Sequence, residues 1–166
     1  TERVASPAMA NYGDWQLGIY FNGLVGERPE YPMTFAEFER RAEEAMTDEL
    51  WSYVSGGAGN EHTQRANVSA FERWGLIPRV FAGAAERDLR VDLFGTTMPS
   101  PLMFAPVGVI GLCDPDGHGE LATARAAATT GVPMILSTLS EDPMEDVAAE
   151  LGDTPGWFQL YPPKDR

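Results

Sequence analysis

Beyond residue 99, the chain alternates short, continuous apolar runs with stretches of helical spacing. Continuous apolar runs are typical of strands that are covered on both faces. A glycine stands directly after each helical stretch, where it favours the end of a helix. Strand, helix, strand, helix and strand in this order predict an α/β fold with a parallel sheet and right-handed crossovers. The expected strands are 102–106, 134–137 and 157–161, and the expected helices are 117–130 and 143–151.

Three short helices are expected over residues 34–74. The first opens at Thr34, whose hydroxyl can accept a hydrogen bond from the N–H of Glu37 while the Glu37 carboxylate reaches back to the cap. The other two begin near Asp48 and Asn60. Apolar residues at helical spacing are expected to face inward. They are Phe35, Phe38, Ala42 and Ala45 in the first helix and Ala66, Ala70 and Phe71 in the third.

The remaining segments lack a helical period. Residues 1–33 are rich in Gly, Pro and aromatics and predict an extended arm, which packs on its own body or on a neighbouring subunit. Residues 87–98 alternate in polarity around Gly95 and predict a small hairpin. We therefore divide the chain into an arm at 1–33, a helical cap with a hairpin at 34–98, and an α/β part at 99–166.

Composition narrows the class of protein. The 166 residues carry 25 acidic and 12 basic side chains, a net charge of −13, and 43% of them are apolar, which is enough to bury a core. Such acidity disfavours nucleic acid and anionic membrane surfaces as partners. Cys113 is the single cysteine, so an internal disulfide is excluded. No signal peptide or membrane-spanning run is evident, and we expect a cytoplasmic protein. The chain begins with Thr rather than Met, so we expect a trimmed or partial chain.

Polar residues at the expected strand ends are the candidates for chemistry. In parallel α/β folds, ligands bind beyond the carboxyl ends of the strands. Gly108 follows the first strand, Ser137 and Thr138 follow the second, and Gln159 and Tyr161 lie on the third. Hydrogen bonds to neighbouring loops are the structural alternative for these side chains. Gln159, inside an otherwise apolar strand, is the strongest indication of a ligand.

One motif imitates a dinucleotide site. Residues 117–122 match the Gly-x-Gly-x-x-Ala pattern, but eight residues separate them from the preceding strand, and the motif should follow its strand at once. The acidic Asp114, Asp116 and Glu120 would also repel a pyrophosphate. We therefore reject an NAD site. We expect no metal site either, because neither histidine has a second one nearby.

Several segments together resemble the FMN-dependent α-hydroxy-acid oxidases and dehydrogenases. The resemblance covers nearly everything from about residue 33 to the end. It also extends to the lactate 2-monooxygenase branch of the family, through residues 11–14, 23–26 and 61–67. The segments that carry the family resemblance are Tyr53 to Ala58 with Glu61, Thr63 and Asn67, Pro78-Arg79, Ala105 to Gly108, Ala122 to Ala127, Ser137-Thr138 and Phe158 to Tyr161.

The resemblance implies a (β/α)8 barrel with N-terminal helices before it and FMN across the carboxyl ends of the strands. Residues 99–166 would then form its first three strands, about three βα units. Tyr53 would bind the substrate carboxylate, and Tyr161 would hydrogen-bond the reacting hydroxyl or the carbonyl formed from it. A phenol suits both tasks because it donates a directed hydrogen bond while neutral. The residues that would contact the cofactor are Pro106, Val107 and Gly108 along the flavin ring and Ser137 and Gln159 at its polar edge.

Two positions refine the expected substrate. Gly108 stands where many oxidases of this family carry Ala, and Leu139 stands where plant-type glycolate oxidases carry Trp. Both differences fit the lactate monooxygenase branch. The resemblance thus implies oxidation of L-lactate with O2, giving acetate, CO2 and water, or pyruvate and hydrogen peroxide.

The family's catalytic base and carboxylate-binding arginines have no counterpart in these 166 residues, and a barrel needs about 250 residues. We therefore expect the N-terminal piece of an oxidase that works with the C-terminal part of the same enzyme, in a homo-oligomer, and is inactive without that part. The alternative is a non-catalytic barrel fragment that serves as a binding or assembly module.

Overall fold

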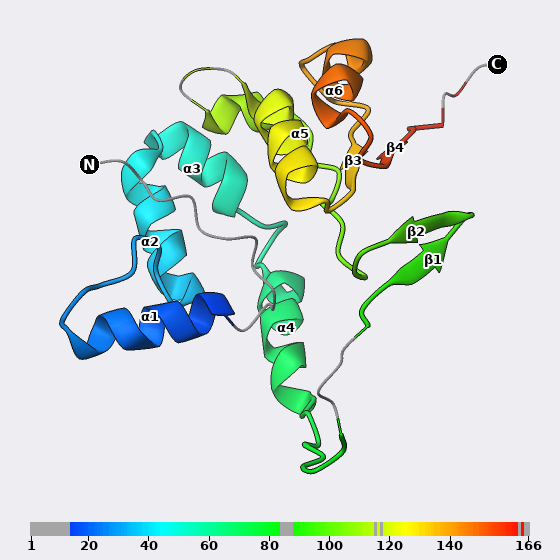
Figure 1. Cartoon of the computed structure of the whole chain (residues 1–166). Coiled ribbons are helices and arrows are strands. Elements are labelled where there is room, and N and C mark those ends of the chain that lie inside the picture. The colour runs from blue at the N-terminus through cyan, green and yellow to red at the C-terminus, as the bar shows by residue number, and fades with distance from the viewer. Residues whose placement is uncertain (1–13, 84–87, 115, 117, 163, 165–166) are drawn as a thin grey trace. The chain divides into compact units, whose positions relative to one another are not determined.

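The computed structural model describes residues 14–83, 88–114, 116, 118–162 and 164 (Figure 1). The chain divides into two compact units, Thr1–Gly56 and Gly57–Arg166. This division falls inside the segment 34–98 that the sequence pattern groups together. The three-part division by sequence stays a prediction.

The first unit contains a helix where the sequence predicted an extended arm. Helix α1 spans Asp14–Leu24, so that prediction was wrong for this segment. Its carboxyl end explains why a helix forms and stops here. Gly26 has a φ of +84°, the N–H of Glu27 donates to the carbonyl of Asn22, and the N–H of Gly26 donates to that of Gly23. These two bonds form a Schellman motif, which satisfies carbonyls at a helix end.

Two further helices complete the first unit. Helix α2 spans Phe35–Ala45, and the Thr34 hydroxyl accepts from the Glu37 N–H at 3.3 Å, as predicted. The Glu37 carboxylate pairs with Arg40 at 2.6 Å. Helix α3 spans Asp48–Ser55, and its cap is Thr47 rather than Asp48. The Thr47 hydroxyl accepts from the N–H of Leu50. Thr47 can do this because the capping residue is the one directly before the first helical residue.

The second unit begins with helix α4, His62–Ala70, and a short 3-10 helix, η1, Phe71–Arg73. An antiparallel hairpin follows, with β1 at Val91–Leu93 and β2 at Thr96–Met98, and confirms the hairpin that the alternation predicts. Its turn carries Gly95 at a φ of +81°.

A parallel pair of strands forms the centre of the second unit. Strand β3, Met134–Leu136, pairs with β4, Gly156–Phe158, so that Leu136 faces Phe158. Phe104 bridges Met134 in parallel on the other side of β3. The expected first strand is thus reduced to one bridge, and the third ends before Gln159, but the parallel α/β order is confirmed.

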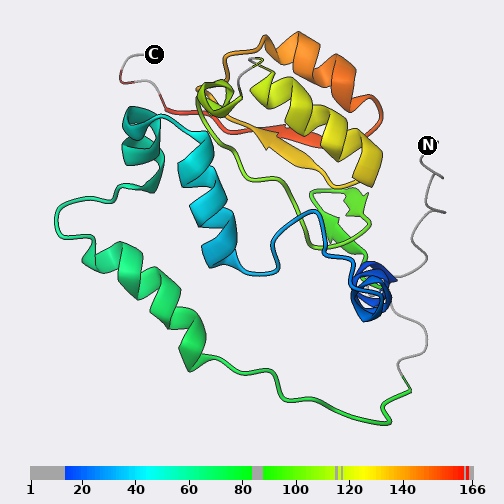
Figure 2. The same ribbon diagram turned by 90° about the vertical axis from the view of Figure 1, so that its left-hand side faces the viewer.

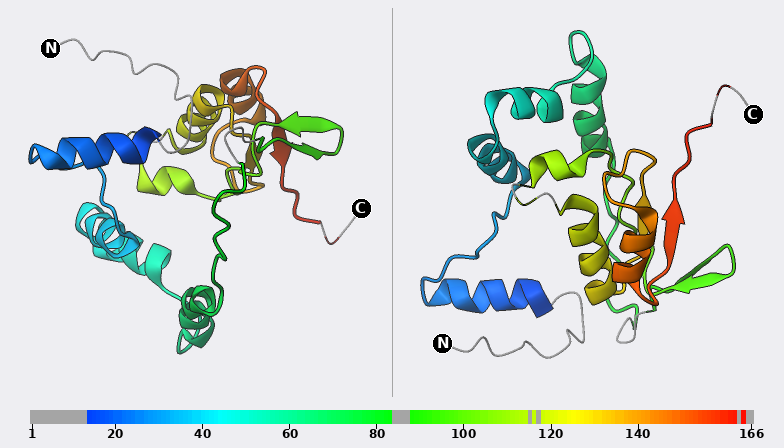
Figure 3. Two further views of the ribbon diagram at one scale, coloured as in Figure 1. Left: turned by 60° about the horizontal axis from the view of Figure 1, so that its bottom comes forward. Right: turned by 90° about the horizontal axis from the view of Figure 1, so that it is seen from above.

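Two helices cover one face of these strands (Figures 2 and 3). Helix α5, Gly119–Thr130, follows the 3-10 helix η2, Ile110–Cys113, and ends at Gly131, whose φ is +70°. Helix α6, Met144–Leu151, lies beside α5. Small Ala side chains on α5 allow the close packing. The buried core consists of Ala124, Ala127, Met134, Leu136 and Val147.

Many apolar side chains outside this core are exposed. None of the residues in α2, α3 or α4 is buried. Phe35 is 92% exposed and Phe71 is 81% exposed, so the inward faces predicted for their segments are uncovered in this chain. Among the described residues, no helix is long and apolar enough to cross a membrane.

Candidate functional site

The carboxyl ends of β3 and β4 bring Ser137, Thr138 and Gln159 together. Gln159 follows β4, and its N–H still donates to the Leu136 carbonyl at 2.8 Å. The Gln159 amide oxygen accepts from the Ser137 hydroxyl at 3.4 Å and from the Thr138 N–H at 3.3 Å. Ser137 is 4% exposed, and its hydroxyl also accepts from the N–H of Leu139 at 3.1 Å. Two sequence-predicted site residues, Ser137 and Gln159, are therefore in contact.

These bonds fix the orientation of the Gln159 amide. A backbone N–H needs an acceptor, so the Thr138 N–H must face the amide oxygen rather than the amide nitrogen. The Nε2 donors then point away from Thr138. The structural alternative to a ligand is that these side chains only bond to neighbouring segments. Such bonds account for the Gln159 amide oxygen, but among the described residues they give no partner to the two N–H donors of its Nε2 group.

Tyr161 is attached to the same group through its backbone. Its N–H donates to the Thr138 hydroxyl at 3.0 Å. The Tyr161 residue is 54% exposed. The sequence pattern singled out Thr138 as a residue at a strand end but gave it no role, and here it contacts two of the predicted site residues.

The predicted flavin-facing segment lies beside the loop after β3. Pro106 and Val107 are exposed, and Gly108 is half-buried. A Cβ atom on Gly108 would lie 2.8 Å from the Cβ of Leu139, so only Gly fits there without movement. The next residue, Val109, has a φ of +50°, a rare conformation for a β-branched residue, and its N–H donates to the Leu139 carbonyl at 3.1 Å.

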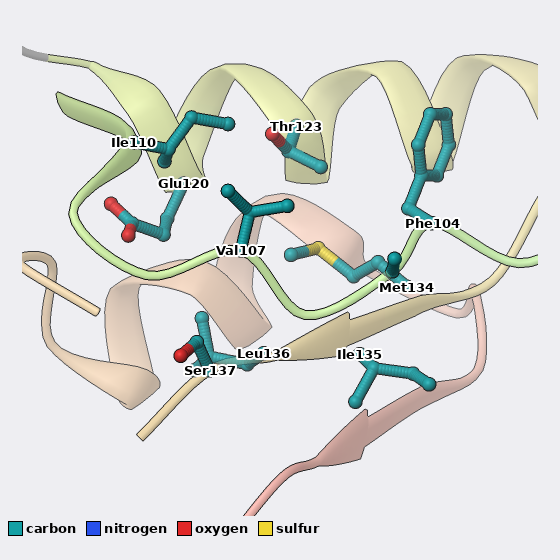
Figure 4. Close-up of a pocket in the computed structure, with 10 residues that line it drawn as sticks. Phe104, Val107, Ile110, Glu120, Thr123, Met134, Ile135, Leu136 and Ser137 are labelled. Carbon is teal, nitrogen blue, oxygen red and sulfur yellow. The ribbon is translucent and has the colours of Figure 1, made fainter. Parts of the chain in front are cut away.

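A pocket of about 150 Å³ lies between α5 and the strands (Figure 4). Its lining is mostly apolar, but the Glu120 carboxylate enters it from α5. Glu120 is 3% exposed, and neither carboxylate oxygen has a hydrogen-bond partner among the described residues. Burial therefore raises the pKa of this carboxyl, despite the opposing influence of the Glu120 and Glu141 backbone N–H groups. Sequence reasoning missed Glu120 as an unusual group, because burial is not visible in the sequence.

The imitation dinucleotide motif has a packing explanation at one of its glycines. A Cβ on Gly119 would lie 2.6 Å from the backbone nitrogen of Gly111, so Gly119 lets α5 approach η2 closely. Gly117 lies outside the described residues. Among the residues that are described, no group of three or more His, Cys, Asp or Glu side chains could hold a metal ion.

Tyr53 belongs to the first unit. It lies on α3 and is 68% exposed. The structure therefore unites Ser137, Gln159 and the Tyr161 backbone, and sets Gly108 against the neighbouring Leu139. Tyr53 belongs to the first unit, whereas these residues belong to the second. The roles predicted for all of these residues stay predictions.

The residues of the site suit the flavin ring of FMN but not its phosphate group. The polar edge of a flavin ring offers carbonyl oxygens, which suit the Nε2 donors of Gln159, and a ring N–H, which suits an acceptor such as the Ser137 hydroxyl. A phosphate dianion prefers Arg, Lys or a helix N-terminus. Residues 101–124 contain no Lys or Arg, and Arg125 is paired with Glu150 at 3.2 Å. These residues can therefore hold the ring edge, but the phosphate needs basic groups from another part of the protein.

Comparison with known proteins gives a consistent result. Residues 42–166 match the family described as FMN-dependent dehydrogenase. An L-lactate oxidase of Lysinibacillus sphaericus is 40% identical over 153 residues, which are 92% of this chain and 38% of that protein.

Solved structures agree with this comparison. A lactate oxidase of Pediococcus acidilactici superimposes with a TM-score of 0.75 at 33% identity, covering 84% of this chain and 38% of that one. A mandelate oxidase gives a TM-score of 0.70 at 38% identity, covering 78% of this chain and 38% of that one.

The chain thus spans 38% of the length of each of these three proteins. The family match covers the whole α/β part, including the strand ends that carry Ser137 and Gln159. The resemblance inferred from the sequence is confirmed: the chain belongs to the FMN-dependent dehydrogenase family.

Proposed function

We propose that this chain is part of an FMN-dependent 2-hydroxy-acid oxidoreductase that oxidises L-lactate. The observation that carries the proposal is the contact between Ser137 and Gln159 at the ends of two parallel strands. The Nε2 donors of Gln159 and the remaining lone pair of the Ser137 hydroxyl suit the polar edge of a flavin, and the chain belongs to a family described as FMN-dependent.

The finer fold assignment belongs to this proposal. Phe104, β3 and β4 lie in parallel order and are joined by helical crossovers, as the first three strands of a (β/α)8 barrel would be. In that barrel, residues 1–33 form the arm, 34–98 the helical cap with its hairpin, and 99–166 the first three strands. The rest of the barrel comes from the C-terminal part of the same enzyme.

Within the site, each predicted residue has a distinct task. When bound, FMN supplies the two-electron oxidation of the hydroxy acid. The backbone of Pro106, Val107 and Gly108 lies along the ring. Gln159 donates to the polar edge of the ring through its Nε2 group. The Ser137 hydroxyl gives its proton to the Gln159 amide oxygen, so it bonds the ring as an acceptor.

Two tyrosines serve the substrate. Tyr53 binds the substrate carboxylate, and Tyr161 hydrogen-bonds the reacting oxygen. Both phenols are neutral donors, so a positively charged carboxylate clamp and the general base must come from the rest of the protein. The cytoplasmic location and the homo-oligomer expected from the sequence also stay predictions.

L-lactate is proposed as the substrate on two grounds. The Lysinibacillus sphaericus and Pediococcus acidilactici proteins are named lactate oxidases. Leu139, which stands where plant-type glycolate oxidases carry Trp, also lies beside Gly108 next to the proposed ring position. We further propose the monooxygenase outcome, acetate with CO2 and water, over pyruvate with hydrogen peroxide, because Gly108 fits that branch of the family.

The test uses the complete protein that contains this chain. Anaerobic addition of L-lactate should bleach the flavin absorbance, and aerobic turnover should yield acetate rather than pyruvate. Pyruvate with stoichiometric hydrogen peroxide would refute the monooxygenase assignment alone. A complete preparation without bound flavin, or with flavin that lactate does not bleach, would refute the oxidoreductase assignment.

A non-catalytic binding or assembly module is the second candidate. It is favoured by the uncovered apolar side chains on α2 and η1, including Phe35 and Phe71. Intact-mass analysis separates the two candidates. A covalently continuous chain of about twice this length, as a barrel of about 250 residues with a cap requires, would remove the module.

A further inference from the structure

We propose that Thr138 is a positioning residue, which sets the orientation of Gln159 and Tyr161 through its hydroxyl and its N–H. The inference rests on the proposed function, since it concerns the same site. It assigns a role to a residue that contacts two site residues but is not itself expected to touch the substrate.

The geometry joins three groups to one residue. The Thr138 hydroxyl donates to the backbone carbonyl of Gln159 and accepts from the N–H of Tyr161. The Thr138 N–H donates to the Gln159 amide oxygen. Thr138 therefore holds both the backbone and the side chain of Gln159, and the backbone of Tyr161.

The place of these bonds in the sheet gives them their importance. The β4 ladder ends at Phe158, and the last regular backbone contact is that of the Gln159 N–H with Leu136. Beyond this point Tyr161 is held by a side chain rather than by a strand. Because the Thr138 hydroxyl both donates and accepts, it takes the place of the backbone hydrogen bonds that the sheet no longer supplies at the position where the site residues begin.

A methyl group in place of the hydroxyl would remove two of the three bonds. Thr138→Val keeps the β-branched shape, so the packing of Thr138 is retained while its donor and acceptor are lost. Thr138→Ser keeps the hydroxyl. Thr129→Val is the matched control, because Thr129 is exposed and its hydroxyl donates to the Arg125 carbonyl within α5, away from the strand ends.

The first measurement uses the complete FMN-loaded protein. Thr138→Val should raise the dissociation constant of FMN and lower kcat, each about 10-fold, with KM for lactate changed less than about 3-fold. Thr138→Ser and Thr129→Val should stay within about 3-fold of the wild type in all three quantities. A Thr138→Val protein that loses thermal stability but keeps wild-type FMN affinity and kcat would overturn the positioning role.

The second measurement needs no cofactor and no variant. Amide hydrogen exchange of the wild-type complete protein should protect the Tyr161 N–H to within about 10-fold of the Gln159 N–H, since both are hydrogen-bonded. Exchange of Tyr161 at the rate of a free amide would overturn the proposal, even if Thr138→Val fails to fold. A wild-type protein without flavin would instead refute the proposed function, whereas wild-type activity in Thr138→Val refutes only this inference.

Discussion

Glu120 shows how one residue can couple the stability of the second unit to pH. Its carboxylate is buried against the strands without a hydrogen-bond partner among the described residues, so the charged form is disfavoured. Its pKa is raised above the ordinary 4.5, first by burial and then by the charges of Asp142 and Glu141. The folded state therefore holds a proton at pH values where the unfolded chain has released it.

We expect Glu120→Gln to stabilise the protein at neutral and higher pH. With the folded pKa raised, the contribution of Glu120 to stability is fully present below pH 4.5 and is lost as the pH rises through the folded pKa. Gln has no charge to bury, so the variant should have the higher melting temperature at about pH 8, and the difference should shrink towards about pH 4. Thermal melts across this range provide the measurement.

Glu145→Gln is the control for this titration. Glu145 lies exposed in the first turn of α6, where a negative charge is favourable, so its replacement should change the melting temperature only slightly and in the opposite direction, with a small loss at neutral pH. A Glu120→Gln protein that is less stable than the wild type at about pH 8 would mean that the carboxylate has a partner in the complete protein.

Gln159 illustrates what a single residue can reveal from the sequence. An amide inside an apolar run predicted a polar task at a strand end, and Gln159 contacts Ser137 there, while its role toward a ligand stays a prediction. The hydrogen bonds of Thr138 to Gln159 and Tyr161 could not be predicted in the same way. They depend on which residues become neighbours across two parallel strands, and that register is not visible along one chain.

At the scale of elements, helix ends were predicted well where the capping residue was unambiguous. Gly131 and Gly152 were expected to follow their helices and do so, because both adopt positive φ values. Asp48 was expected to cap α3, but Thr47 stands next to it and has the extended backbone of a cap. Two adjacent candidate caps cannot be separated by residue type alone.

The cap of α3 gives a direct test. Thr47→Ala should lower the free energy of unfolding by about 1 kcal/mol, because it removes the acceptor for the Leu50 N–H. Asp48→Ala removes a charge from the first turn and should cost less, about 0.3–1 kcal/mol. Urea unfolding of the two variants measures both values, and an equal or larger effect of Asp48→Ala would contradict the assignment of the cap.

The loop after Phe104 and the loop after β3 are packed against each other at Gly108. Gly108→Ala should destabilise the protein by about 1–3 kcal/mol, because the new methyl group would overlap the Leu139 side chain. Leu139→Ala should largely restore stability in the double variant. Urea unfolding of the two single variants and the double variant measures the coupling, and strictly additive effects would show that the two loops are not in contact.

At the scale of the whole molecule, the order of strands and helices in the α/β part was predictable, whereas the fate of the apolar faces was not. Alternating apolar runs and helical stretches indicated parallel strands with crossovers, and β3 and β4 are arranged in this way. Phe71 was expected to face inward and is exposed. A period tells which side of a helix is apolar but not which part of the protein covers it.

FMN should stabilise the complete protein through the ring-edge contacts proposed here and the phosphate contacts of the remaining parts. At a free concentration of about 100 times its dissociation constant, binding adds about 2.7 kcal/mol to the free energy of unfolding. A thermal shift assay with FMN should show the increase, and NAD should give none, because the imitation dinucleotide motif is explained by the packing of Gly119. Stabilisation by NAD and not by FMN would reverse the rejection of the dinucleotide site.

The parallel order of Phe104, β3 and β4 also has a consequence for biosynthesis. Each strand lies beside the one made immediately before it, so the sheet can assemble in the order in which the ribosome releases the chain. In the described part of the chain, the newest strand, β4, pairs on one side with β3 alone, and an unpaired strand edge is a template for any extended segment. In the barrel proposed here, the nascent sheet is exposed to pairing with other nascent chains until the next strand is added, so closely spaced ribosomes on one message should lower the yield.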